Sequence, residues 1–105
     1  MFNINNEWWR LEFVPSNSYH LRRYDGSYAI GVCNDIHKKI YISEELYGEL
    51  LKKVICHELT HAAMFSYNVE LSLEQEEILA DIIATYGEEI IHITNTLFDK
   101  IKGRH

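Results

Sequence analysis

The sequence His57-Glu58-Leu59-Thr60-His61 has residue types and a spacing that suit metal chemistry. In a helix of about 3.6 residues per turn, two histidines four positions apart lie on one face and can bind the same divalent ion. Glu58 then stands beside that ion, where its carboxylate can accept a proton from metal-bound water. Zn²⁺ takes imidazole nitrogen and carboxylate oxygen in a tetrahedral shell, so the pattern predicts one Zn²⁺ per chain and requires a third protein ligand.

The third ligand is expected from the acidic segment Glu74-Gln75-Glu76-Glu77, and both Glu76 and Glu77 are candidates. Glu77 is favoured because Asp81 lies one helical turn further on the same face, where it can accept the free ring N–H of a ligating histidine. Glu76 would share its face with Ala80 instead. The alternative is that the histidines are surface residues and that the acidic segment only complements a helix dipole.

Other side chains have weaker claims to a role in the site. Tyr67 and Tyr86 carry hydroxyl groups, and either is a candidate donor to a developing oxyanion. Cys56 adjoins the first histidine but points about 100° away around the helix, so we expect it to be a buried apolar residue. His92 follows two isoleucines and is expected to be a partly buried histidine without a catalytic role.

Residues 1–42 are predicted to form a small antiparallel β-meander. Turn-forming residues separate four runs that are rich in β-branched and aromatic residues. These runs are Trp8–Val14, Tyr19–Tyr24, Tyr28–Cys33 and Lys39–Ile42. Successive side chains of a strand point to opposite faces, so Trp8 and Trp9 should place one ring on each side of the sheet.

Two long helices are predicted to follow the meander, which gives an α+β fold. Residues 43–66 should form the metal-binding helix, with Ser43 as its N-cap. Residues 72–101 should form the second helix, because Ser72 and Gln75 match a capping box, while Gly87 should kink or split it. A short connection between the helices would bring the acidic segment beside the histidines.

Composition indicates one globular domain over residues 1–105, with 47% hydrophobic and 25% charged residues. The net charge of -6 and the scattered basic residues argue against nucleic-acid binding. No signal peptide and no apolar stretch of membrane-spanning length is recognised, so we expect no membrane association. Cys33 and Cys56 are the only cysteines, too few for a disulfide framework, and we therefore expect a cytoplasmic protein.

The pattern His57-Glu58-x-x-His61 followed by Glu77-x-x-x-Asp81 resembles the gluzincin arrangement of thermolysin-like peptidases. That resemblance implies that Glu77 is the third zinc ligand and that Asp81 supports the first histidine. The hairpin that leads straight into the metal helix is similar to that of the small ImmA/IrrE-type metallopeptidases of bacteria and mobile elements. The likeness covers roughly residues 28–90 and implies a minimal zincin-like fold, although that family usually opens with a helix and this chain does not.

The predicted function is therefore a zinc-dependent metallopeptidase with Glu58 as general base. Its peptide or protein substrate is expected to pair with an edge strand by β-augmentation, among Tyr28 to Cys33 or Lys39 to Ile42. One alternative is a non-catalytic zinc-bearing binding or regulatory protein of a phage or mobile element. A purely structural zinc domain is less expected, because such sites usually have four ligands and are rich in cysteine. Glu58 separates these interpretations, since only the enzyme needs a base there.

Overall fold

The computed structural model describes residues 1–103, so the last two positions of the predicted 1–105 domain lie outside the described residues. The strands are β1 (Phe2–Ile4), β2 (Glu7–Val14), β3 (Gly31–Asn34) and β4 (Lys39–Ser43). A short 3₁₀ helix, η1 (Tyr19–Leu21), follows β2, and the two long helices are α1 (Gly48–Ser66) and α2 (Leu73–Lys102). The predicted α+β class, a small sheet followed by two long helices, is confirmed.

The sheet is mixed, whereas a purely antiparallel meander was expected. Its strand order is β1-β2-β4-β3, with β2 and β4 parallel and the other two pairs antiparallel. The segment between β2 and β3 stays at the end of the sheet where β2 finishes. β3 begins at that same end, on the outer edge of the sheet. β4 then returns between β3 and β2 in the direction of β2, which makes β3 an edge strand and β4 an interior one.

The strand predicted at Tyr19–Tyr24 is wrong, because Tyr19–Leu21 forms η1. The hydroxyl of Ser18 caps this turn by accepting a hydrogen bond from the backbone N–H of His20. Leu21 is fully buried with Val14 and Tyr41 on the sheet face that α1 does not cover. Leu21 therefore packs on the outer face of the sheet, and the run does not add a strand to the sheet.

Strand β1 was not predicted, and it pairs with β2 through a two-residue turn, Asn5-Asn6. Both asparagines have positive φ, 49° and 65°. Two-residue hairpin turns of this kind match the twist of the flanking strands, and asparagine tolerates that backbone conformation better than most residues. The turn therefore fixes the register of the N-terminal hairpin.

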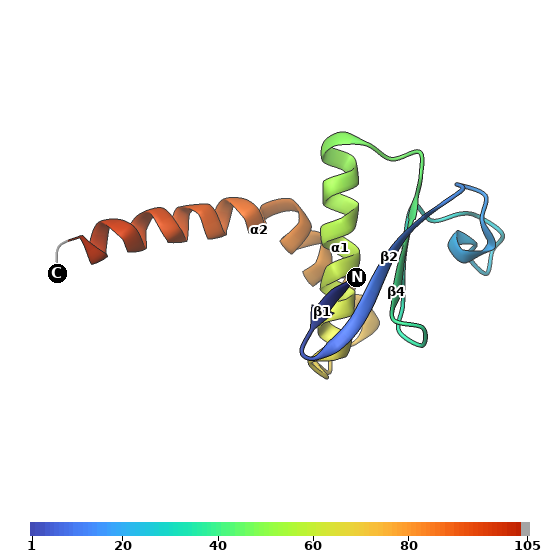
Figure 1. Cartoon of the computed structure of the whole chain (residues 1–105), viewed down its shortest axis with the longest axis horizontal. Coiled ribbons are helices and arrows are strands. Elements are labelled where there is room, and N and C mark those ends of the chain that lie inside the picture. Colours follow the sequence, from blue (N-terminus) through green and yellow to red (C-terminus); the bar gives the residue numbers. More distant parts are fainter. Residues whose placement is uncertain (104–105) are drawn as a thin grey trace.

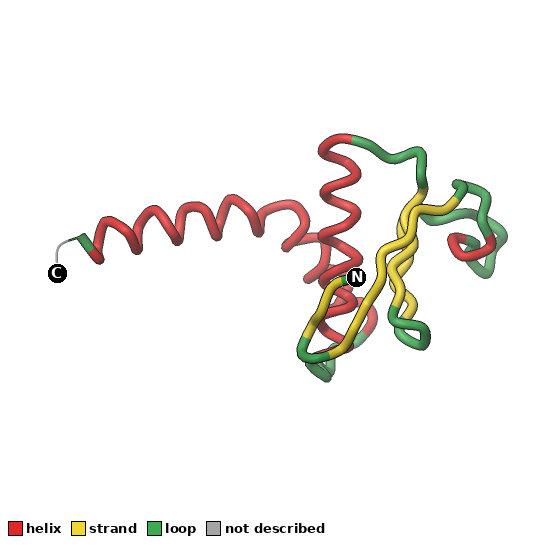
Figure 2. The backbone as a smooth tube through the Cα atoms, viewed as in Figure 1, coloured by secondary structure: helices red, strands yellow, loops and turns green. Residues whose placement is uncertain are grey.

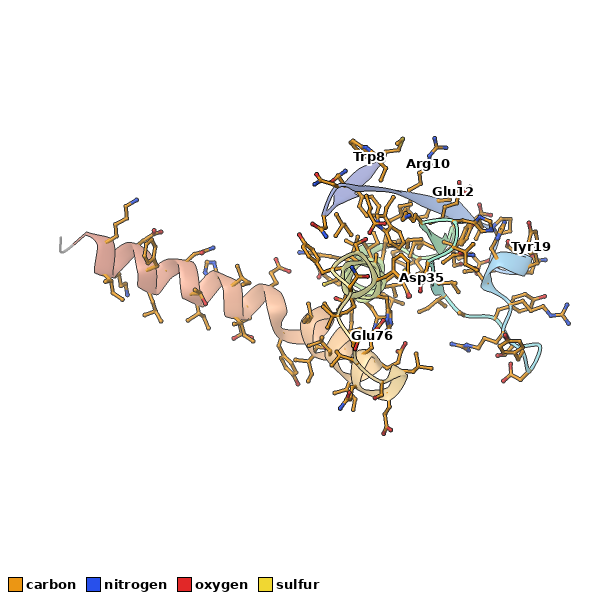
Figure 3. The ribbon with its side chains drawn as sticks, turned by 90° about the horizontal axis from the view of Figure 1, so that it is seen from below. Trp8, Arg10, Glu12, Tyr19, Asp35 and Glu76 are labelled. Atoms are coloured by element: carbon orange, nitrogen blue, oxygen red, sulfur yellow. The ribbon has the colours of Figure 1, made fainter. Side chains whose placement is uncertain are left out.

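The main core lies between the sheet and α1. Trp9, Ile40, Ile42 and Ala62 are fully buried there, and the Trp9 indole N–H donates to the hydroxyl of Ser66 on α1 at 2.9 Å. Trp8 is 61% exposed, as strand alternation predicted for one of the two tryptophans. Figure 3 shows Trp8, Arg10 and Glu12 along β2, pointing away from the helices.

Helix α1 begins at Gly48, five residues later than predicted, because Ser43 completes strand β4. Ser43 is therefore not the N-cap, which is Tyr47 and makes no side-chain capping bond. The helix ends as expected near Tyr67, where Asn68 takes a left-handed conformation with φ 54°. Such a residue closes a helix and reverses the chain.

Helix α2 begins with the predicted capping box, since Ser72 accepts from the backbone of Gln75 and the Gln75 side chain accepts from the backbone of Ser72. It continues through Gly87 as one helix, so the predicted split does not occur. In Figures 1 and 2, the first turns of α2 cross behind α1, and the rest of α2 extends away from the body. Among residues 1–103, no helix is long and apolar enough to cross a membrane.

Candidate metal centre

The site forms where the second half of α1 faces the first turns of α2. His57, Glu58 and His61 come from α1, and the carboxylates that face them come from α2. Strand β3 approaches the same part of α1 very closely, because a Cβ on Gly31 would lie 3.1 Å from Cγ of Glu58. Glycine at this position lets the edge strand run directly past the site.

Three ligand atoms converge between the two helices. The Nε2 atoms of His57 and His61 are 3.2 Å apart. One carboxylate oxygen of Glu77 lies 3.2 Å from Nε2 of His57, and the other lies 2.9 Å from Nε2 of His61. These three residues form a group that could hold a metal ion, and no other such group is found in the described part of the chain.

The other ring nitrogen of each histidine faces a carboxylate. Nδ1 of His57 lies 3.0 Å from Oδ1 of Asp81, and Nδ1 of His61 lies 2.6 Å from Oε1 of Glu76. A carboxylate accepts but does not donate, so these contacts favour a proton on both Nδ1 atoms. Each Nε2 atom of a neutral histidine then presents a lone pair toward Glu77.

This proton arrangement would let the centre accept a cation. With both histidines neutral, the three converging groups are all acceptors, and their close approach requires protons or a metal ion between them. Ligand atoms about 2.0–2.1 Å from a tetrahedral zinc ion lie roughly 3.3 Å from one another. The observed separations of 2.9 to 3.2 Å are close to that value, so the donor set fits such an ion.

Glu58 is available as a base and makes no ion pair within residues 1–103. It is only 6% exposed and lies in the cavities that border the three ligands. Burial raises the pKa of its carboxyl group, although the nearby histidines act in the opposite direction. Burial also disfavours charge on His61, but its hydrogen bond to Glu76 and the neighbouring carboxylates outweigh that effect and raise its pKa.

Two adjoining cavities, of about 400 and 360 Å³, open over the centre. Both are lined by His57, Glu58, Glu77 and Gly31. The backbone from Ala29 to Cys33, which leads into and forms the edge strand β3, runs along the two cavities. The candidate ligands and base thus line a cleft that has the edge strand β3 as one wall.

The cleft contains one arginine that the sequence did not single out. Arg23 lines both cavities, whereas Lys53 lines only one. The backbone of Arg23 forms a tight turn: its N–H donates to the carbonyl of Ser27, and its carbonyl accepts from the N–H of Gly26. Arg23 comes from the loop between η1 and β3, so its relation to the helices is a tertiary contact with no signature in local spacing.

The acidic side of the cleft holds Asp35 and Glu76, which Figure 3 shows near the middle of the molecule. Burial and the charge of Glu76 raise the pKa of the Asp35 carboxyl group. Burial also raises the pKa of the Cys33 thiol, which lies 3.8 Å from Asp35. Burial thus favours the neutral thiol of Cys33, which lies beside the site and outside the ligand group.

Several residues considered from the sequence are not brought to the centre. Tyr67 and Tyr86 are exposed and line neither of the two cavities, so nothing in the geometry favours them as oxyanion donors. Cys56 is partly buried and lies outside the ligand group. His92 is exposed, whereas a partly buried position was expected.

Glu76 is the residue whose role the sequence analysis missed. It was weighed only as a rival of Glu77 for the metal, and in the structure it supports His61 instead. Its position directly before Glu77 was the available signal, because neighbouring residues on a helix point about 100° apart and can serve two different histidines.

No model of a known protein family, no curated protein and no solved structure matched this chain. The resemblance to gluzincins and ImmA/IrrE-type peptidases therefore stays a prediction. Support for a function comes from the geometry of the site.

Proposed function

We propose that the protein is a zinc-dependent metallopeptidase. The observation that carries the proposal is the convergence of three acceptor atoms from His57, His61 and Glu77, with both Nδ1 atoms held by carboxylates. Three protein ligands beside an open cleft suit a catalytic zinc site, since structural sites usually have four. A zinc ion held there would supply a bound water of lowered pKa and would polarise a carbonyl group.

Residues of the chain itself would supply the other parts of the reaction, which are proton transfer and orientation of the ligands. Glu58 would take the proton from an attacking water and pass it to the leaving amine. Its burial favours this role, because a base whose pKa is raised toward neutrality both accepts and returns a proton more readily. Asp81 and Glu76 hold the two imidazoles in the tautomer and orientation that ligands need.

The edge strand β3 provides a way to position a peptide substrate. An extended peptide that pairs with its free edge would pass along both cavities and across Glu58. Of the two segments expected to offer an edge, only the one that contains β3 does so, because β4 lies inside the sheet.

Arg23 lines both cavities, and we assign to it the stabilisation of the negatively charged oxygen that forms when the carbonyl is attacked. Arg23→Gln should lower kcat while leaving zinc content unchanged.

The decisive experiment compares Glu58→Gln with the unchanged protein. Zinc content and fold should be retained, because Glu58 is beside the ligands rather than among them. Cleavage of a mixed peptide library, followed by mass spectrometry, should fall by several orders of magnitude. His57→Ala is the matched control and should lose zinc and activity together.

The same experiment tests the second candidate, a zinc-bearing binding or regulatory protein from a phage or mobile element. If the zinc-loaded protein cleaves nothing and Glu58→Gln keeps the full biological effect while chelation abolishes it, that second function replaces the first. A buried carboxylate with no ion-pair partner among the described residues favours the peptidase, since a binding protein gains nothing from it.

A further inference from the structure

The last part of α2 is an exposed helix with a broad apolar face. We call residues 88–102 the arm, and each of them is exposed. Figure 1 shows the arm extending away from the sheet and α1, in a molecule that measures 57 × 30 × 28 Å. An isolated helix of this length is only marginally stable in water, because helices in proteins are stabilised mainly by packing of their apolar face.

The apolar residues of the arm form one continuous stripe. Ile90, Ile93, Leu97 and Ile101 recur at spacings of three and four residues, and Ile91 and Phe98 widen the stripe on one side. These side chains are 48–60% exposed. A residue of this size has on the order of 200 Å² of surface, so the six offer roughly 600 Å² of apolar area. With flanking polar residues, this approaches the roughly 800 Å² that each partner contributes to a standard interface.

The distribution of charge along the arm favours one kind of partner, a second copy of the arm in antiparallel orientation. The half nearer the body carries Glu88 and Glu89 and no lysine or arginine, whereas the outer end carries Lys100 and Lys102 against one Asp99. Two arms that pack antiparallel bring the acidic half of each beside the basic end of the other. Parallel packing would place like charges together, which is unfavourable.

We propose that the arm pairs with the arm of a second copy of this chain, antiparallel, to form a homodimer. The dimer buries the apolar stripe and places Glu89 of one copy near Lys100 of its partner, while the metal centres stay on the two bodies. A membrane surface fits the arm less well, because helices that lie on membranes carry mainly lysine and arginine on their polar face.

Sedimentation equilibrium of the full chain over a concentration series tests the proposal. The unchanged protein should have twice the 12.4 kDa mass of one chain. Ile93→Asp should sediment as a single chain, and any loss of helical signal in circular dichroism should not exceed the share of the arm, residues 88–102. The matched control is Ile36→Asp, which alters another exposed isoleucine outside the arm and should leave the dimer intact.

Charge reversal tests the antiparallel arrangement. Glu89→Lys and Lys100→Glu should each raise the dissociation constant about tenfold or more, and the double variant should recover most of the loss. A double variant as weak as the single ones would overturn the antiparallel pairing. A single-chain mass for the unchanged protein at every concentration would overturn the homodimer. Binding of such a monomer to vesicles of phosphatidylcholine and phosphatidylglycerol would instead assign the arm to a membrane surface.

Discussion

The two carboxylates that hold the histidines should differ in their effect on zinc affinity. Removal of a group that orients a metal ligand usually weakens binding by about 10- to 100-fold, or roughly 1.4–2.7 kcal/mol. Glu76 lies 2.6 Å from its histidine and its side chain is 23% exposed, whereas Asp81 lies 3.0 Å away and is 72% exposed. Short charge-assisted hydrogen bonds are stronger, and exposed ones are screened by water. We therefore expect Glu76→Ala near the upper end of that range and Asp81→Ala near the lower end.

Zinc titration in competition with a chromogenic chelator measures this difference directly. Glu74→Ala is the control, because it removes the same charge from the same first turn without touching a histidine. Glu76→Gln should fall between Glu76→Ala and the unchanged protein, since its amide oxygen still accepts from the imidazole. The reasoning fails if Glu74→Ala and Glu76→Ala lose equal affinity, or if neither Glu76→Ala nor Asp81→Ala loses any.

Three further predictions concern stability. Gly31→Ala would place a Cβ 2.7 Å from Val54 and 3.1 Å from Glu58, so it should cost about 1–3 kcal/mol and lower the calorimetric Tm; an unchanged Tm would contradict the tight packing. Ser66→Ala leaves the buried indole N–H of Trp9 without its acceptor, and urea unfolding should show a loss of about 1–3 kcal/mol. Zinc at about 100 times its dissociation constant should stabilise the fold by about 2.7 kcal/mol and raise Tm, with reversal by a chelator; a Tm indifferent to zinc would argue against the metal centre.

The parts of the site that could be predicted from the sequence depend on spacing within one helix. His57 and His61 share a face of α1, and Glu77 and Asp81 share a face of α2, whatever the angle between the helices. The roles of Glu76 and Arg23 depend on how separate elements meet. The side of His61 that Glu76 reaches follows from the position of α2 beside α1, and no local pattern encodes that position.

The fold shows the same division between local and tertiary information. The capping box at Ser72 and the end of α1 near Asn68 use neighbouring residues, and both were predicted correctly. Ser43 has the chemistry of an N-cap, but pairing with Val14 on β2 keeps it in the sheet. The run that starts at Tyr19 has strand-like composition, yet burial of Leu21 over the sheet fixes it as a 3₁₀ turn. Both errors arose where tertiary packing overrides local preference.

A metal ion held at the interface between the two long helices would link metal binding to the position of α2. Ala80 is the only fully buried residue of α2, and Leu79, Ile83 and Ala84 are partly buried, so apolar packing supplies only part of its attachment to α1. The ion pair between Lys52 and Glu88 is exposed, and such pairs are worth little. The other contacts between the helices join three carboxylates of α2 to two histidines of α1. The negative charge of these carboxylates is balanced only by protons on the histidines or by a cation. A cation at the centre would bind ligands from both helices, so metal affinity and the attachment of α2 to α1 would depend on each other. The first turns of α2 carry the candidate ligands, whereas the arm beyond them keeps only an exposed ion pair from Glu88 to Lys52 and leaves its apolar stripe open to a partner.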